Sequence, residues 1–180
     1  MGPLFTVGHS TRTLDELVRI CEAHGIRAIA DVRRFPGSRR SPHFARRVLE
    51  ESLPARGIDY FWVPKLGGRR KLPADAPPTG WKVEAFAAYA EHMRGPEFRA
   101  GIESVLASAA SRPTAIMCAE AWPYRCHRRL IADWVELNGI EVLHLIDEER
   151  ADRHQPTSFA RRVGDDVVYE GEPQLELPLG

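Results

Sequence analysis

The residues with the greatest chemical potential lie in one segment at positions 117–129, whose sequence is MCAEAWPYRCHRR. It follows a short apolar run and precedes an amphipathic stretch, so we expect it to join a strand to the first turn of a helix. The free amides and positive dipole at a helix start bind anions and lower the pKa of a nearby thiol. We therefore predict that Cys118, Glu120, Cys126 and His127 are catalytic, with a cysteine as nucleophile and Glu120 as general acid or base.

Other chemistries remain open for the same residues. Phosphatase chemistry is disfavoured, because the arginine that follows Cys118 is too far along the chain and the loop lacks glycine. Zinc would take Cys118, Cys126 and His127, with His9 or Asp31 as the fourth ligand, but the sequence lacks the CxxC pair typical of zinc sites. A redox-active disulfide between Cys118 and Cys126 is a third option. From these patterns we assign no metal and no cofactor.

Polar residues also follow two earlier apolar runs. His9 and Ser10 come after LFTVG, and Asp31 and Arg33 flank the end of AIADV. In parallel sheets, ligands bind beyond the carboxyl ends of the strands. We therefore predict that His9, Ser10, Asp31, Arg33 and Arg128 bind the substrate. The two arginines and the helix amides are expected to hold an anion such as phosphate, unless neighbouring carboxylates neutralise them.

The elements that must position these residues follow from the apolar pattern. Short β-prone runs at 4–7, 28–32, 60–63, 115–118 and 140–146 alternate with amphipathic stretches near 14–24, 44–53, 83–93, 97–110 and 126–137. This alternation predicts a Rossmann-like α/β fold, with a mainly parallel five-stranded sheet and helices on both faces. We place a single α/β domain at 1–150 and a partly irregular C-terminal extension at 151–180, where Val167–Tyr169 favours another strand.

Length and composition set further bounds. The chain has 180 residues, 43% of them hydrophobic, which suffices for one domain without disulfides. No apolar run has the length of a membrane span, and the first residues lack the features of a secretory signal. Three cysteines are too few for a disulfide framework. We expect a soluble cytoplasmic protein with reduced thiols and no membrane partner.

The net charge of zero hides an asymmetry. Residues 1–72 carry 14 basic and 7 acidic side chains, and the rest of the chain carries the opposite excess. One loop combines Arg33, Arg34, Arg39 and Arg40 with Phe35. Arginines beside aromatic rings suit contacts to phosphates and stacked bases.

We therefore expect a phosphate-bearing ligand or nucleic acid as the partner, and a function in binding or processing a nucleic acid or nucleotide. Two alternatives stay open. One is a small-molecule enzyme with a nucleophilic cysteine, and the other is a non-catalytic anion-binding module.

The chain resembles the family called domain of unknown function 488. The resemblance rests on TVGHS at 6–10, DVR at 31–33 with Pro36 and Ser38 after it, CAE at 118–120 and CHR at 126–128, and extends over about residues 4–147. It implies no particular activity. It does imply that one site contains His9, Asp31, Arg33, Cys118, Glu120, Cys126, His127 and Arg128.

Overall fold

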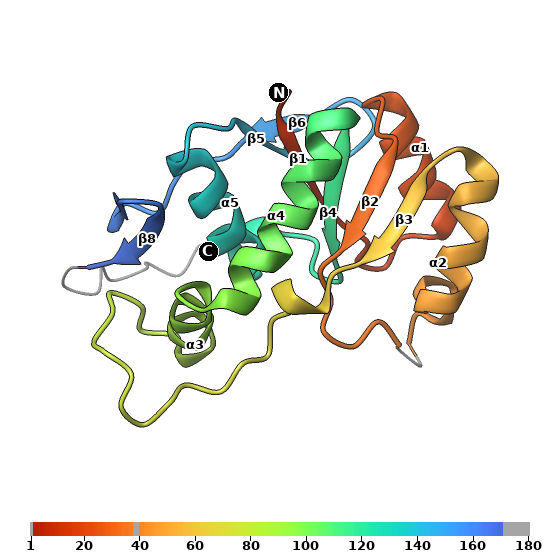
Figure 1. Cartoon of the computed structure of the whole chain (residues 1–180). Coiled ribbons are helices and arrows are strands. Elements are labelled where there is room, and N and C mark those ends of the chain that lie inside the picture. The colour runs from red at the N-terminus through yellow and green to blue at the C-terminus, as the bar shows by residue number, and fades with distance from the viewer. Residues whose placement is uncertain (1, 38–39, 171–180) are drawn as a thin grey trace, which may run out of the picture.

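The structure is a computed structural model that describes residues 2–37 and 40–170. Its main sheet has six strands in the order β3-β2-β4-β1-β5-β6 (Figure 1). The strands are β1 (Leu4–Gly8), β2 (Ala28–Asp31), β3 (Asp59–Trp62), β4 (Thr114–Cys118), β5 (Val142–Leu145) and β6 (Ala151–Arg153). The first five run parallel, and β6 is antiparallel to β5. The expected α/β fold with a mainly parallel sheet is confirmed.

The predicted count of five strands omits β6. This strand has three residues, two of them charged, and it pairs with β5 after a turn closed by the Asp147 carboxylate, which accepts hydrogen bonds from the amides of Glu149 and Arg150. No apolar run marks such a strand in the sequence. Its pairing makes the sheet mixed rather than purely parallel.

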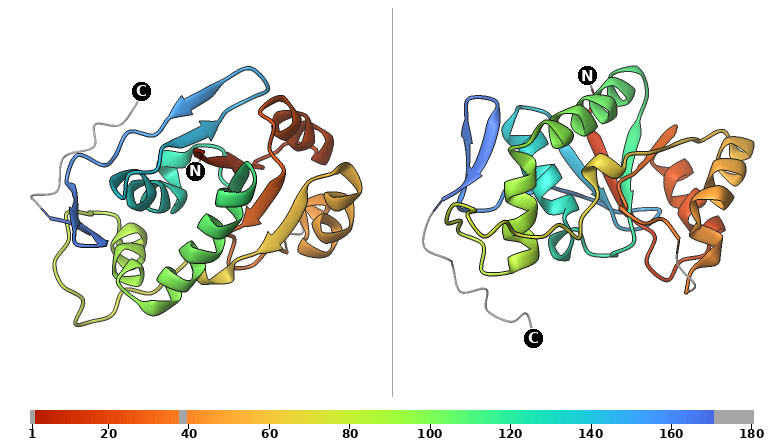
Figure 2. Two further views of the ribbon diagram at one scale, coloured as in Figure 1. Left: turned by 45° about the horizontal axis from the view of Figure 1, so that its top comes forward. Right: turned by 60° about the horizontal axis from the view of Figure 1, so that its bottom comes forward.

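Helices cover both faces of the sheet, as expected. One face carries α1 (Leu14–Ala23) and α2 (Arg46–Ser52), and the other carries α3 (Glu84–Met93), α4 (Pro96–Ser111) and α5 (Arg128–Leu137). Figure 2 shows these two layers from two further directions. Burial of apolar side chains on both faces explains why the strands are almost continuously apolar.

A small hairpin lies against the second helical layer. Its strands are β7 (Ala160–Val163) and β8 (Asp166–Tyr169), which includes the run expected to form another strand. Val167 and Tyr169 are buried in the same core as α3, α4 and α5. The tail at 171–180, which we expected to be irregular, lies outside the described residues. Among the described helices, none is long and apolar enough to cross a membrane.

The sheet order creates a switch point at the carboxyl ends of β1 and β4. These neighbours are in register with Gly8 opposite Cys118, and β2 flanks β4 with Asp31 opposite Met117. The chain leaves β1 toward α1 on one face and leaves β4 toward α5 on the other. The two connections therefore lead to opposite faces of the sheet, and ligands of such sheets bind beside a switch point of this kind.

Gly8 lets the connection after β4 pass directly over the end of β1. A Cβ atom at position 8 would overlap the carbonyl oxygen of Glu120, and Ala121 lies close behind it. The amides of His9 and Ser10 then donate to the carbonyls of Cys118 and Ala119, both at 2.9 Å. The close approach of two backbones thus joins the connections that follow β1 and β4.

We predict that Gly8→Ala destabilises the fold by about 2–3 kcal/mol, because the added methyl group forces two backbones apart. Urea unfolding followed by circular dichroism measures this loss. Gly37→Ala is the control, since a Cβ at position 37 meets no atom within 4 Å, and it should change stability by less than about 0.5 kcal/mol. Equal stability of the two variants would contradict the close approach.

Candidate functional site

A pocket of about 740 Å³ opens at the carboxyl edge of the sheet, where the switch point lies. Its walls come from the segments that follow β1, β2, β3 and β4. Of the predicted site residues, those that line it are His9, Ser10, Arg33, Cys118, Glu120 and His127. The structure therefore brings together side chains that are more than a hundred residues apart in the sequence. Asp31, Cys126 and Arg128 do not line the pocket.

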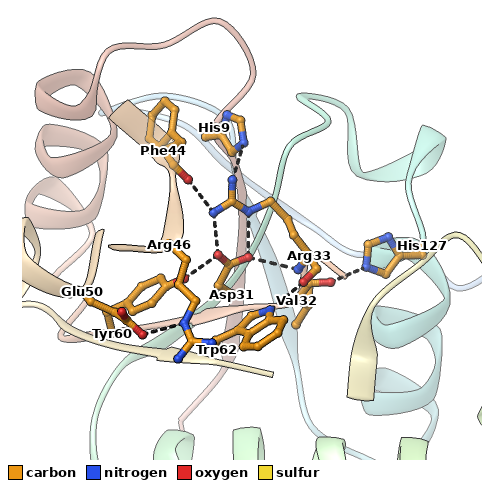
Figure 3. A network of polar contacts seen from close by, with 10 residues as sticks. All are labelled: His9, Asp31, Val32, Arg33, Phe44, Arg46, Glu50, Tyr60, Trp62 and His127. Carbon is orange, nitrogen blue, oxygen red and sulfur yellow. Dashed lines mark hydrogen bonds and ion pairs between the residues drawn. The ribbon is translucent and has the colours of Figure 1, made fainter. Parts of the chain in front are cut away.

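A buried ion pair between Asp31 and Arg33 lies beside this pocket, and Figure 3 shows its contacts. The guanidinium of Arg33 donates from Nε and Nη2 to the two carboxylate oxygens of Asp31, at 2.8 and 2.6 Å. The Asp31 carboxylate also accepts from the Arg33 amide at 3.0 Å and from the Tyr60 hydroxyl at 2.6 Å. Burial by itself lowers the pKa of Arg33, but the bonds and charge of Asp31 outweigh it and raise that pKa. The Arg33 guanidinium therefore stays charged.

The same guanidinium orients His9. Arg33 Nη1 lies 3.2 Å from His9 Nε2, and His9 Nδ1 lies 3.1 Å from the carbonyl oxygen of Ser10. The ring also stacks on Phe44, with centroids 4.2 Å apart. Burial and then the Arg33 charge lower the pKa of His9 to about 4. At neutral pH the ring is thus uncharged, accepting from Arg33 and donating to Ser10.

These contacts change the expected role of Arg33. Its Nη2 donates to the carbonyl of Phe44 at 2.8 Å as well as to Asp31, so the fork is occupied by the protein itself. Asp31 neutralises the charge that we expected to hold an anion. Arg33 lines the pocket but acts there as a support for the loop and for His9.

Arg128 lies away from the pocket and is 1% exposed. Its Nη2 donates to the carbonyls of Glu120 and Ala121, and its Nη1 donates to the Thr6 hydroxyl at 3.3 Å. The predicted anion site made of Arg33, Arg128 and helix amides is therefore not formed. A buried guanidinium needs acceptors, and the curled connection after β4 supplies backbone carbonyls for it.

A chain of buried hydrogen bonds continues from Thr6 and escaped the sequence analysis. Thr6 Oγ1 lies 2.8 Å from His144 Nδ1, His144 Nε2 lies 2.9 Å from His154 Nδ1, and His154 Nε2 lies 2.9 Å from Asp133. The carboxylate of Asp133 also accepts from the hydroxyl of Tyr169 at 3.0 Å. This chain ties β1 and β5 to α5 and the hairpin, which is a structural role.

The two cysteines and His127 meet at the wall of the pocket. His127 Nδ1 lies 3.5 Å from Cys126 Sγ and 3.9 Å from Cys118 Sγ. His127 Nε2 lies 3.1 Å from the carbonyl oxygen of Val32 (Figure 3). This contact fixes the ring, and Nδ1 is the nitrogen that lies near both sulfurs. Of the two thiols, Cys118 lines the pocket and Cys126 lies behind it.

The two thiols differ in acidity. The neighbouring Cys118 thiol, with help from His127 and Arg128, holds the pKa of Cys126 well below its usual value despite burial. The proximity of Cys126, together with burial, raises the pKa of Cys118 well above its usual value. Cys126 precedes the helix instead of lying in its first turn, because its backbone is extended and α5 begins at Arg128 with His127 as its cap.

The remaining predicted residues lie at the mouth of the pocket. Glu120 is exposed there, with its carboxylate 3.4 Å from the Trp122 amide. Ser10 adopts a left-handed backbone conformation with φ of 47°, which is uncommon for a residue with a side chain. Such a conformation turns the chain sharply after His9 and keeps Ser10 at the pocket wall.

The structure adds a basic rim to the pocket, made of arginines that are not among the predicted site residues. Arg34, Arg40 and Arg69 line the pocket, together with His43 and Gly68. The arginine-rich loop had drawn attention to Arg34 and Arg40, whereas Arg39 lies outside the described residues. Arg69 begins a short basic run, RRK at 69–71, in the long segment after β3. Arg34 Nη1 donates to the Arg69 carbonyl at 3.1 Å and thereby joins the two segments.

We predict that Asp31→Asn destabilises the protein by about 3–5 kcal/mol, because it leaves the buried Arg33 charge without its partner. Thermal and urea unfolding measure this effect. Glu50→Gln is the matched control, since it breaks an exposed pair with Arg46 at 2.6 Å and should cost less than about 1 kcal/mol. Similar losses in both variants would show that the Asp31 pair is not the supporting element.

The buried histidine chain predicts a pH-dependent stability. Burial, with His154 and Arg128 acting in the same direction, lowers the pKa of His144 to about 3. Between pH 6.5 and 3 the unfolded chain therefore binds a proton that the folded chain refuses, so stability falls on acidification.

His144 contributes a slope of about 1.4 kcal/mol per pH unit in this window, and His144→Asn should remove it. Urea unfolding at a series of pH values tests this, with the surface variant His24→Asn as control. An unchanged slope in His144→Asn would exclude His144 as the group responsible.

Neither a curated protein nor a solved structure matches the chain significantly. The family model described as "Domain of unknown function DUF488" matches residues 13–135. The matched span contains the Asp31–Arg33 pair and the Cys118, Cys126 and His127 cluster, and it begins after His9 and Ser10. The chain belongs to the DUF488 family.

Proposed function

We propose that the pocket binds a phosphate-bearing ligand of nucleotide size, and that the wall formed by Cys118, Glu120 and His127 acts on it. The observation that carries this proposal is the charge around the pocket. Arg34 and Arg69 lie on its rim, and among its described lining residues Glu120 is the one acidic side chain. The Asp31–Arg33 pair is neutral as a unit, so the rim carries an excess of positive charge.

The chemistry of this rim suits phosphate. Guanidinium forks donate two parallel hydrogen bonds to phosphate oxygens. The rim arginines come from the segments after β2 and β3, so a ligand that contacts both segments is held from two sides. A volume of about 740 Å³ falls in the range of pockets for small organic ligands. This size supports a nucleotide over a long strand.

The mouth also offers a stacking surface. Phe35 is 66% exposed and lines the pocket, and the Arg34 guanidinium lies 5.6 Å from the centre of its ring. An exposed aromatic ring beside an arginine supports binding of a planar base.

The free thiols of Cys21, Cys118 and Cys126 agree with the expected cytoplasmic location.

A second candidate is a small-molecule enzyme that uses Cys118 as its nucleophile. It is favoured by the position of this thiol, which is the one of the pair that lines the pocket. This candidate differs in one consequence. A ligand that reacts with Cys118 leaves a covalent adduct that intact-mass measurement detects, whereas the anion-binding proposal involves no adduct.

We predict that Arg34→Ala and Arg69→Ala each weaken binding of ADP at least about tenfold, because each removes a charged donor worth about 1.5–3 kcal/mol. Isothermal titration calorimetry with ADP and with pyrophosphate measures the change. Raising the salt concentration should weaken binding of both ligands.

The control is Arg47→Ala, which removes the same charge from the exposed face of α2, where Arg47 lies 3.5 Å from Glu51. Its ADP affinity should equal that of the wild type. Equal weakening by all three substitutions would mean that net charge, not the pocket, attracts the anion. Tighter binding of a single-stranded oligonucleotide than of ADP would contradict a nucleotide-sized ligand.

A further inference from the structure

We propose that Cys118, Cys126 and His127 form a zinc site whose fourth coordination position opens into the pocket. Each residue offers one ligand atom, and the three atoms lie within 4.8 Å of one another. The proposal does not depend on the identity of the anion that the rim binds. It rests on the arrangement of donors around one point.

The spacing of the donors fits tetrahedral zinc. Zinc binds sulfur at about 2.3 Å and imidazole nitrogen at about 2.0–2.1 Å, which places sulfur and nitrogen ligands about 3.6 Å apart. In this structure the two sulfurs lie 3.5 and 3.9 Å from His127 Nδ1. Both sulfur-to-nitrogen distances are thus close to ligand spacing, and all three donors lie within 4.8 Å of one another, so little movement is needed to surround one ion.

The second nitrogen of His127 supports the same assignment. A histidine that binds a metal through one nitrogen usually donates from the other to a carbonyl or carboxylate. His127 Nε2 lies 3.1 Å from the Val32 carbonyl oxygen, so the proton resides there and the Nδ1 lone pair points to the sulfurs. The Tyr89 ring packs beside the imidazole, with centroids 5.1 Å apart, and limits its rotation.

The space beside the cluster is kept clear by a glycine. A Cβ atom at Gly68 would lie 2.9 Å from His127 Nδ1. Gly68, Cys118 and His127 all line the pocket. A tetrahedral ion bound by three protein donors on this wall therefore has its remaining position directed at the pocket, where a water molecule or a ligand oxygen completes the coordination.

The donor types select the metal. Two thiolates and one imidazole are soft and borderline donors, which suit zinc and exclude magnesium or calcium. Three protein ligands with one open position are typical of catalytic zinc, whereas structural zinc has four protein ligands. The sequence already offers these three donors but signals zinc only weakly, because they come from the end of β4 and from a turn eight residues later, without a CxxC pair.

Metal analysis of the untagged protein tests the proposal. Inductively coupled plasma mass spectrometry of protein purified without chelators should find about one zinc per chain, and Cys118→Ser and Cys126→Ser should each lower this content at least tenfold. Cys21→Ala is the control, because Cys21 is buried in the other core and should leave the zinc content unchanged.

X-ray absorption at the zinc edge keeps the test independent of how the variants fold. The wild-type spectrum should fit two sulfur and one imidazole ligand, with a light atom as the fourth, at the distances given above. A spectrum without sulfur, zinc retained by the double Cys118→Ser, Cys126→Ser variant, or a Cys118–Cys126 disulfide in the isolated protein would overturn the proposal.

The zinc site and the proposed anion binding can be tested independently. Arg34→Ala changes ADP binding and should leave the zinc content intact, while Cys126→Ser changes the zinc content. If Cys126→Ser loses zinc and keeps its ADP affinity, both proposals stand, and the metal site and the anion site are separate parts of one pocket. An ADP affinity unaffected by the rim arginines would remove the proposed function and leave the metal site standing.

Discussion

The ion pair between Asp31 and Arg33 is the constraint on which the pocket depends. It lies at the end of β2 with both side chains buried, and it fixes the loop that follows. That loop presents the Val32 carbonyl to His127 on one side and the Arg33 guanidinium to His9 on the other. Two polar walls of the pocket are thus oriented by a single neutral pair. A charged pair in this position contributes precision of placement more than net stability.

Much of the fold follows from local patterns. Apolar runs of strand length alternate with amphipathic stretches, and this alternation favours a parallel sheet with helices on both faces. The limits appear where local signals end. β6 is short and charged, so nothing in its residues distinguishes it from a loop. The insertion of β4 between β1 and β2 brings together segments that are far apart in the sequence, so no single segment encodes it.

The sequence could predict which strand ends meet at the site, but not the direction in which each side chain points. Residues after β1, β2 and β4 meet because the carboxyl ends of parallel strands share one edge. The long side chains of Arg33 and Arg128 turn inward instead, because buried carboxylate and carbonyl oxygens need donors. Gly68 and Arg69 enter the pocket from a segment without regular structure, whose path depends on contacts with α4 and His127.

The central position of β4 also governs the order in which the molecule can be built. In the finished sheet β1 and β2 lie about two strand spacings apart, roughly 9.5 Å, with β4 between them. Until residues 114–118 are available, the edges of β1 and β2 that β4 pairs with have no partner, and unpaired strand edges are prone to aggregate. Pairing of β4 with both strands joins β1 to β2 and places Cys118 beside Gly8 in the same event. Cys118 therefore reaches the edge of the sheet only when its centre is complete.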